Sequence, residues 1–384
     1  MCFVVKYLYS WFATTAMGIE DIAAEEITRS GGSSVEVGVG KVFFKANLEA
    51  MYRLNYTART INRLFLLLTR DVFERLEDVY RIAKSVDYAQ FISPDSSFAV
   101  RSVRVGVHDF TSIDVSRVVG QAVIDSYVSS RGSRLRVNLK NPDVEIGVYV
   151  HGNEVVIGIN TTGESLHKRR YRVYNHPAAL KTTLATAMLR IAGYSGQPLL
   201  DPLCGGATIP IEAAHMARKY PVRMFREDYL FYKLLVHDPH LEREVREKIF
   251  SEVNYGKYQI FCMEISPKHV KGAVENVKSA KVADTVEIIP GDATREESYR
   301  GIDPELVVTN PPYGVRSHNL KRIESFYQVF LSVLRNLYSG RVLVLITAST
   351  RQFESAANRV GVYIRTSRTV AHGGLQSRIY TLRL

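Results

Sequence analysis

Residues 199–208 read Leu-Leu-Asp-Pro-Leu-Cys-Gly-Gly-Ala-Thr, and this stretch decides the fold. Its apolar start predicts a buried strand over residues 198–203, with Asp201 close to its end. Gly205 and Gly206 predict a turn at which the backbone approaches a ligand closely, because neither residue carries a Cβ atom. A helix is expected over residues 209–218, and its first turn offers unpaired N–H groups. The spacing is neither G-x-G-x-x-G nor G-x-x-x-x-G-K-[ST], which argues against a dinucleotide site and a P-loop.

The alternation of strands and helices continues through the C-terminal half of the chain. Further strands are expected over residues 259–265, 286–290, 306–309 and 341–347. Helices are expected over residues 178–192, 268–280 and 326–337. This order is typical of an α/β fold with a doubly wound, mostly parallel sheet. Residues 220–257 interrupt the alternation, and we interpret them as a charged helical insertion over one face of that sheet.

The N-terminal half has a mixed α+β pattern. Alternating apolar residues predict strands over residues 4–15, 35–46, 63–69, 98–107, 135–139, 144–150 and 154–160. Helical spacing is found over residues 19–29, 48–56 and 113–127, with helical turns at 79–83 and 88–92. Two small layered α+β units in succession are therefore expected.

Composition excludes several classes of protein. The chain has 384 residues, of which 46% are hydrophobic and 23% charged, so it is neither disordered, collagenous nor a coiled coil. It contains no run of about 20 uncharged apolar residues, so no transmembrane helix is expected. Residues 1–19 fit an amphipathic strand better than a signal peptide. The net charge of +11 is consistent with a nucleic-acid partner, although many soluble proteins are as basic.

The three cysteines, Cys2, Cys204 and Cys262, are far apart in the sequence. They offer no zinc-ligand spacing and no disulfide framework, so we expect no metal site and a reducing, cytoplasmic location.

Acidic residues follow two further predicted strands. Glu264 ends the strand at 259–265, where an acid can accept hydrogen bonds from ribose hydroxyls. Asp292 follows the strand at 286–290 and can accept a hydrogen bond from an adenine amino group. Taken alone, Glu264 is more often a surface residue and Asp292 a turn cap.

The fourth strand end reads Asn310-Pro311-Pro312-Tyr313. The two prolines fix the backbone and remove two N–H donors, which leaves carbonyl oxygens beside the Asn310 side chain. Two acceptors and a flat aromatic face suit a planar amine, and a merely structural turn is the alternative.

These four strand ends, in this order and spacing, resemble the Rossmann-like methyltransferases that use S-adenosylmethionine (SAM) and act on exocyclic amino groups. The first half resembles a ferredoxin-like domain followed by a THUMP domain, an RNA-binding module. The whole chain is similar to the THUMP-containing guanosine N2-methyltransferases, most of all to the archaeal tRNA (guanine(6)-N2)-methyltransferase type. Relatives often have Cys-Gly-Ser-Gly where this chain has Cys204-Gly205-Gly206-Ala207.

The resemblance implies four parts: a ferredoxin-like domain (1–60), a THUMP domain (61–160), a basic linker (161–177) and a methyltransferase domain (178–384). It implies a catalytic set formed by Asn310, Pro311, Pro312 and Tyr313. It implies a cofactor set formed by Pro177, Ala178, Asp201, Pro202, Cys204, Gly205, Gly206, Ala207, Thr208, Glu264, Ile265, Asp292, Ala293 and Asn310.

The basic linker is the candidate for contact with RNA outside the THUMP domain. Interleaved Arg and Tyr suit phosphate contact and base stacking, whereas the alternative is a solvated linker. The RNA-binding candidates are His167, Lys168, Arg169, Arg170 and Arg172. Residues 1–170 carry a net charge of +2 and residues 171–384 carry +9, so both halves are expected to hold RNA.

The expected reaction is methyl transfer from SAM to N2 of a guanosine in tRNA, at position 6 of the acceptor stem, by a monomer that grips the tRNA 3′ end. Other amino targets remain open: guanine at position 10 of tRNA, guanine in rRNA, adenine N6, or a glutamine amide, which the RNA-binding half disfavours. A non-catalytic RNA-binding protein is the alternative from a different class.

Overall fold

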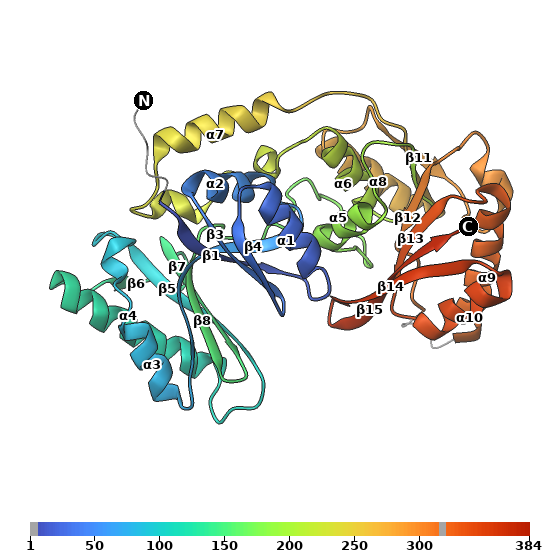
Figure 1. Cartoon of the computed structure of the whole chain (residues 1–384). Helices are drawn as coiled ribbons and strands as arrows, with labels where there is room; N and C mark the ends of the chain where they lie inside the picture. Colours follow the sequence, from blue (N-terminus) through green and yellow to red (C-terminus); the bar gives the residue numbers. More distant parts are fainter. Residues whose placement is uncertain (1–6, 315–319) are drawn as a thin grey trace. The chain divides into compact units, whose positions relative to one another are not determined.

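The computed structural model describes residues 7–314 and 320–384, and these form two compact units (Figure 1). The first unit comprises the chain up to Thr14, Ala24–Leu166 and Glu227–Ile249. The second comprises Thr15–Ala23, His167–Arg226 and Phe250–Leu384. Cys2 and residues 4–6 of the first expected strand lie outside the described residues.

Within the described residues, the first unit is built on one sheet of eight strands in the order β2-β3-β1-β4-β8-β7-β5-β6. The strands are β1 (Tyr9–Thr15), β2 (Ser33–Gly38), β3 (Lys41–Ala46), β4 (Ile61–Val72), β5 (Ser97–Val105), β6 (Arg136–Val137), β7 (Val144–His151) and β8 (Glu154–Asn160). The long strand β4 lies between β1 and β8, so the two successive α+β parts expected from the sequence share one continuous sheet.

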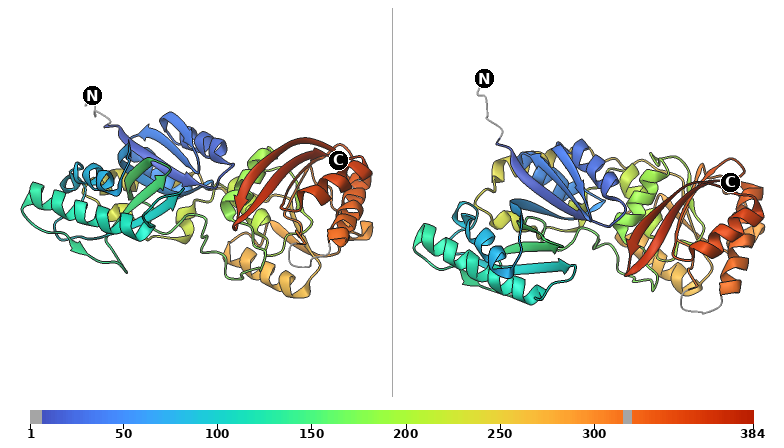
Figure 2. Two further views of the ribbon diagram at one scale, coloured as in Figure 1. Left: turned by 90° about the horizontal axis from the view of Figure 1, so that it is seen from below. Right: turned by 60° about the horizontal axis from the view of Figure 1, so that its bottom comes forward.

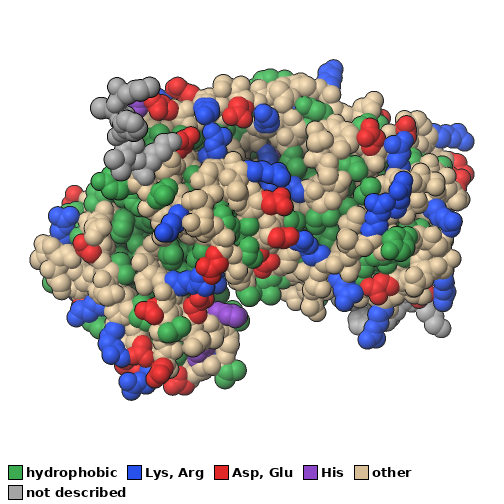
Figure 3. Space-filling model, in the orientation of Figure 1, with side chains coloured by type: hydrophobic (Ala, Val, Ile, Leu, Met, Phe, Trp, Pro, Cys, Tyr) green, Lys and Arg blue, Asp and Glu red, His purple; other side chains and the backbone are tan. Residues whose placement is uncertain are grey.

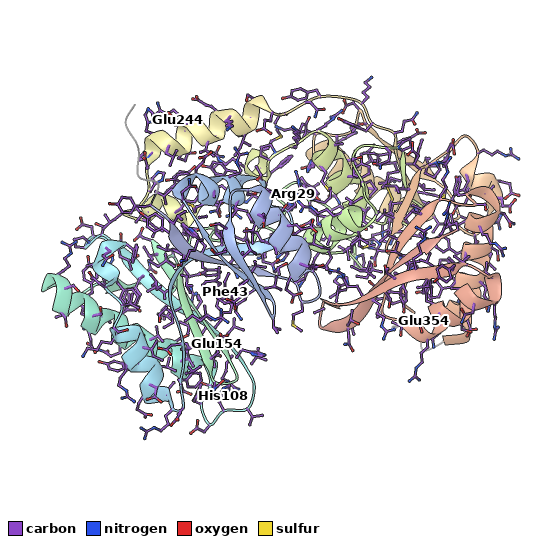
Figure 4. The ribbon with its side chains drawn as sticks, in the orientation of Figure 1. Arg29, Phe43, His108, Glu154, Glu244 and Glu354 are labelled. Atoms are coloured by element: carbon purple, nitrogen blue, oxygen red, sulfur yellow. A yellow bond between two sulfur atoms is a disulfide. The ribbon has the colours of Figure 1, made fainter. Side chains whose placement is uncertain are left out.

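Most elements expected in this half are present. The helices are α1 (Glu20–Arg29), α2 (Leu48–Thr57), α3 (Leu76–Lys84) and α4 (Ser112–Arg131), with a 3₁₀ turn η1 (Tyr88–Gln90). The strand expected over residues 35–46 is instead the antiparallel hairpin β2–β3, because Gly40 has a positive φ of 65° and turns the chain back. In Figure 4, Phe43 and Glu154 mark β3 and β8, where Arg70 of β4 lies over the Phe43 ring and pairs with Glu154.

The sequence analysis expects residues 220–257 to cover one face of the second unit's sheet. Residues 227–249 instead pack in the first unit. They contain the 3₁₀ turn η3 (Leu230–Lys233) and most of α7 (Pro239–Ser251), and they follow the turn η2 (Val222–Phe225). The Tyr52 hydroxyl on α2 lies 2.9 Å from His237 Nδ1, and the Tyr56 hydroxyl donates a hydrogen bond to the buried Glu242 carboxylate. The Phe231 N–H also donates to the Thr161 carbonyl. Aromatic packing and these buried hydrogen bonds explain why the insertion belongs to the first unit.

The second unit contains a seven-stranded sheet, within the described residues, in the order β11-β10-β9-β12-β13-β15-β14. Its strands are β9 (Leu199–Asp201), β10 (Ile260–Glu264), β11 (Val286–Pro290), β12 (Leu306–Thr309), β13 (Val342–Thr347), β14 (Tyr363–His372) and β15 (Leu375–Arg383). The first five run parallel, as expected for an α/β fold, and β15 and β14 add an antiparallel hairpin.

Helices cover both faces of this sheet (Figures 1 and 2). One apolar core gathers residues of α5 (Thr182–Ile191), α6 (Thr208–Ala217) and α8 (Pro267–Ser279). The opposite core gathers residues of α9 (Leu320–Leu337) and α10 (Thr350–Val360), and the 3₁₀ turn η4 (Glu296–Tyr299) adds Tyr299. Alternation along β9 explains the division, since Leu199 belongs to the first core and Leu200 to the second.

The basic linker is partly built into the second unit. The Arg169 side chain is only 2% exposed and its guanidinium lies 3.2 Å from the fully buried Glu212 carboxylate of α6. Tyr171 and Thr186 also donate hydrogen bonds to Glu212. The burial of Arg169 contradicts its assignment to RNA binding, because a buried guanidinium already paired with a carboxylate does not reach a phosphate.

A disulfide links Cys204, in the turn after β9, to Cys262 on β10, with their Cα atoms 5.5 Å apart. The expectation of no disulfide is therefore wrong. The two cysteines are far apart in the sequence but close in space, because parallel pairing places Asp201 level with Cys262.

Removing Arg169 is expected to destabilise the chain. Arg169→Met takes away the guanidinium that faces the buried Glu212 carboxylate, and the free energy of unfolding is expected to fall by about 3–5 kcal/mol. Arg170→Met, at an exposed neighbouring residue, is the matched control and is expected to change it by less than about 0.5 kcal/mol. Denaturant unfolding of the full chain measures both, and equal effects would contradict the structural role of Arg169.

Removing the disulfide is expected to weaken the second unit. For a sequence separation of 58 residues, the double variant Cys204→Ala/Cys262→Ala is expected to lower the free energy of unfolding by about 4 kcal/mol. Dithiothreitol should lower the melting temperature of the unaltered chain and leave that of the double variant unchanged. A melting temperature of the unaltered chain that does not respond to dithiothreitol would contradict the disulfide's role.

Candidate functional site

The candidate site lies at the carboxyl ends of four adjacent parallel strands of the second unit. Asp201 ends β9, Glu264 ends β10, Asp292 follows β11 and Asn310 follows β12. Because these strands are neighbours in the order β11-β10-β9-β12, their carboxyl ends meet at one edge of the sheet. Ligands of doubly wound sheets bind at this edge.

The turn after β9 is held by Glu264. The Glu264 carboxylate, which is 9% exposed, accepts hydrogen bonds from the N–H groups of Gly205 (3.1 Å) and Ser266 (2.8 Å). Gly205 has a φ of +55°, a region in which glycine is unstrained. Ala207 also lies in the left-handed region, with a φ of +62°, and comes directly before α6. The small Ala207 thus occupies a position where glycine would be less strained.

A segment ahead of α5 lies directly on this turn. A Cβ atom added to Gly205 would lie 3.2 Å from His176 Nδ1, and one added to Gly206 would lie 3.3 Å from His176 Cβ. The His176 ring also packs edge-on against His269, with 4.2 Å between ring centroids. Of the residues His176-Pro177-Ala178, His176 lies on the turn, whereas Pro177 and Ala178, which the resemblance assigns to the cofactor, are exposed.

Asn276 joins the turn to this segment and was missed by the sequence analysis. It lies on α8 and is 1% exposed. Its Nδ2 donates to the carbonyls of Gly206 (2.9 Å) and Tyr174 (3.0 Å), and its Oδ1 accepts from the N–H groups of Val173 and Tyr174. One buried amide side chain therefore satisfies backbone groups of both segments, residues 173–174 and Gly206.

Asp201 is a buried carboxyl group with few hydrogen-bond partners. It is 1% exposed and accepts hydrogen bonds from the Thr309 hydroxyl (2.7 Å) and the Leu203 N–H (3.2 Å). Burial raises the pKa of Asp201 to about 7, and the nearby Glu264 adds to the rise. A cation placed beside Asp201 would favour the charged carboxylate.

Asp292 is the more exposed acid of the edge. Its Oδ1 accepts hydrogen bonds from the N–H (2.9 Å) and hydroxyl (2.6 Å) of Thr294, the geometry of a turn cap. Burial opposes ionisation, but the hydrogen bonds from Thr294 and the charge of Arg295 leave the pKa of Asp292 below its usual value. Asp292 is therefore a carboxylate at neutral pH.

The Asn310-Pro311-Pro312-Tyr313 turn is fixed by hydrogen bonds from other elements. The Asn310 Nδ2 donates to the Ala178 carbonyl (3.3 Å), and its Oδ1 accepts from the Tyr313 hydroxyl (2.8 Å). The hydroxyl of the buried Tyr327 on α9 donates to the Pro312 carbonyl (3.0 Å). Ser349, after β13, donates to the Tyr313 carbonyl. Tyr327 and Ser349 were not anticipated, because a tyrosine on the apolar face of a helix looks like an ordinary core residue.

The remaining predicted residues surround these groups. Pro202, Cys204, Thr208 and Ala293 are buried, and Ile265 directly after Glu264 is 62% exposed. Among the RNA-binding candidates, Lys168 and Arg170 are exposed, and Arg172 is half-buried. Arg172 donates hydrogen bonds to the Leu180 carbonyl and the Thr208 hydroxyl. Of the five candidates, Lys168 and Arg170 are the ones placed best to meet a phosphate.

Two searches of the described residues concern other kinds of site. No group of three or more His, Cys, Asp or Glu side chains in that part of the chain is arranged to hold a metal ion. No helix found there is both long and apolar enough to span a bilayer. On the face shown in Figure 3, Lys and Arg side chains are interspersed with Asp and Glu.

Models of three known domain families match the chain. The UPF0020 model, described as an RMKL-like methyltransferase domain, matches residues 169–378. The THUMP domain model matches residues 73–160, and the RlmL ferredoxin-like domain model matches residues 10–65.

Similar proteins were found by sequence and by structure. A tRNA (guanine(6)-N2)-methyltransferase of Archaeoglobus fulgidus is 42% identical over 96% of this chain and 91% of its own length. The enzyme of the same name from Methanocaldococcus jannaschii is 37% identical over 97% of this chain and all of its own length. The methyltransferase SMU.472, solved in complex with S-adenosylhomocysteine (SAH), superposes with a TM-score of 0.85 at 22% identity, over 98% of each chain.

The matched domains occur in the order expected from the sequence, and the methyltransferase model spans the strand ends that gather Asp201, Glu264, Asp292 and Asn310. The chain therefore belongs to the UPF0020 family of SAM-dependent methyltransferases, with ferredoxin-like and THUMP domains ahead of the methyltransferase domain.

Proposed function

We propose that this enzyme transfers a methyl group from SAM to N2 of guanosine at position 6 of the tRNA acceptor stem, and that it acts as a monomer. The observation that carries the proposal is the Asn310-Pro311-Pro312-Tyr313 turn, which lies at the sheet edge beside the glycine turn. The two relatives named tRNA (guanine(6)-N2)-methyltransferase, similar over nearly the whole chain, support the choice of base and RNA.

The residues at the sheet edge fit SAM. Asp201 is a buried carboxyl group with a raised pKa, and the ammonium group of the methionine end would lower that pKa and pair with the carboxylate. The glycine turn leaves no room for side chains between its backbone and His176, which fixes the turn against that segment. Glu264 is assigned to the two ribose hydroxyls and Asp292 to the adenine amino group. When bound, SAM supplies a methyl group already activated on a sulfonium.

The turn at Asn310 supplies acceptors for the target amine. The guanine N2 lone pair is delocalised into the ring, which makes the nitrogen a poor nucleophile. Asn310 Oδ1 and the Pro311 carbonyl are assigned to its two hydrogens, because the Pro312 carbonyl already accepts the Tyr327 hydroxyl. These acceptors favour a pyramidal nitrogen and stabilise the positive charge that develops on it. A strong base is not needed before transfer, since the proton can leave afterwards to water.

Tyr313 and the RNA contacts complete the proposed complex. The Tyr313 ring is assigned to stack on the target base, while its hydroxyl is held by Asn310. A guanine paired in a stem must be flipped out of the helix, which costs a few kcal/mol. The THUMP domain together with Lys168 and Arg170 is proposed to bind the tRNA, and the THUMP domain to grip its 3′ end.

Asn310→Ala tests the proposed site. Loss of one preorganised acceptor is expected to lower kcat for tRNA methylation by about 10²–10³-fold. The activity of Asn358→Ala, which removes an exposed amide on α10, should change little.

Nucleoside mass spectrometry of the reacted tRNA gives the modified base and its position. The expected product is N2-methylguanosine at position 6. Undiminished activity of Asn310→Ala would contradict the site, and modification at another nucleotide would contradict the assigned target.

The pH dependence of SAH binding tests the role of Asp201. Because burial raises the pKa of Asp201 to about 7, the carboxyl is neutral below that pH and must lose a proton to pair with the ligand's ammonium. Affinity is therefore expected to fall by up to about tenfold per pH unit below 7 and to level off above it. Calorimetry between pH 5.5 and 8 should show this slope for the unaltered enzyme and none for Asp201→Asn. Identical slopes for the two proteins would contradict the assignment.

A further inference from the structure

His372, the last residue of β14, lies beside the proposed catalytic turn and has no role in the mechanism described above. Its Nδ1 is 3.5 Å from the Tyr313 hydroxyl, and the two rings meet edge-on with 6.4 Å between centroids. The same hydroxyl is 2.8 Å from Asn310 Oδ1. The Tyr313 hydroxyl, which has one proton to donate, thus lies between Asn310 Oδ1 and His372 Nδ1, with the Ser377 side chain also near it.

The surroundings of His372 favour one place for its single proton. The ring is half-buried and lies close to the Ala179 backbone. Burial and the positive charge of Lys181 together lower the pKa of His372 below its usual value, so the imidazole is neutral at pH 7. A neutral imidazole has a single N–H. If that N–H serves the Ala179 carbonyl, the Nδ1 facing Tyr313 carries a lone pair.

Asn310 is oriented by the same short stretch of chain. Its Nδ2 donates to the Ala178 carbonyl, next to the Ala179 backbone that lies close to His372. This bond fixes the amide with Oδ1 toward Tyr313, so the Asn310 oxygen assigned to the target amine is the one that the Tyr313 hydroxyl occupies.

We propose that His372 is a positioning residue for methyl transfer, which accepts the Tyr313 hydroxyl when the target amine engages Asn310 Oδ1. This inference rests on the proposed function of the Asn310 turn. No covalent bond changes: the Tyr313 hydrogen bond moves from Asn310 Oδ1 to His372 Nδ1, and the amide oxygen then accepts an N–H of guanine. Without His372, the hydroxyl would compete with the amine for the same oxygen.

The proposal makes activity depend on pH through His372. The groups that face its ring are the Tyr313 hydroxyl, the Ala179 carbonyl and the Lys181 ammonium. Protonation converts Nδ1 from an acceptor into a donor, so it can no longer accept the Tyr313 hydroxyl. The value of kcat should therefore fall as the pH drops, with a midpoint below the usual histidine value of about 6.5.

The test is a double-mutant cycle on kcat for tRNA methylation. His372→Leu is expected to lower kcat about tenfold, as for loss of one hydrogen-bond acceptor, with KM and SAH affinity nearly unchanged. In a Tyr313→Phe background, which lacks the hydroxyl, the same substitution is expected to have almost no further effect. His372→Asn, which keeps an acceptor that does not titrate, should regain part of the activity and lose the acid-side decline.

Two outcomes would overturn the proposal: additive effects in the cycle, or an unchanged pH profile in His372→Asn. If His372→Leu fails to fold, the pH profile of His372→Asn decides alone. His240→Leu, at a histidine with an 83% exposed side chain, is the control for loss of a histidine. An inactive Asn310→Ala with a fully active His372→Leu would reject this inference alone, whereas an active Asn310→Ala would reject the proposed function itself.

Discussion

Parallel pairing of β9 with β10 and with β12 is the constraint on which the site depends. β9 has only three residues, and its last one, Asp201, is level with Cys262 of β10. Glu264 therefore stands two residues further along, beside the turn that β9 has already entered. This offset explains why the Glu264 carboxylate reaches the Gly205 N–H and why a disulfide can join Cys204 to Cys262. A shift of one residue in this register would separate all of these groups.

The turn so placed must remain free of side chains, because another piece of the chain lies on it. His176 occupies the space that a Cβ atom at Gly205 or Gly206 would need, and Asn276 bonds to both pieces of backbone. The chain thus presents a short, rigid backbone surface rather than a flexible loop. Under the proposed function such a surface would hold the methyl donor in one orientation, and a donor so held needs little further activation.

Local patterns predicted the parts of the site that local chemistry defines. A buried strand followed by glycines, by an acid or by Asn-Pro-Pro-Tyr is visible in a few residues, so Asp201, Glu264 and Asn310 could be predicted from the sequence. Partners such as Asn276 and His372 could not, because register and topology create their contacts: Asn276 bonds to Gly206 across 70 residues. The same reason explains the missed disulfide and the insertion that joins the first unit.

The basic linker shows why counting charges along a sequence overestimates an RNA surface. Arg169 and Tyr171 contact the buried Glu212 carboxylate. Lys168, just before Arg169, and Arg170, between the two, remain exposed. A buried arginine paired with a buried acid adds nothing to the electrostatic attraction outside the protein. Each inward-facing basic residue therefore reduces the number of phosphate contacts that the sequence suggests. Under the proposed function, attraction for tRNA would then come from fewer linker residues than the sequence offers, together with basic side chains elsewhere.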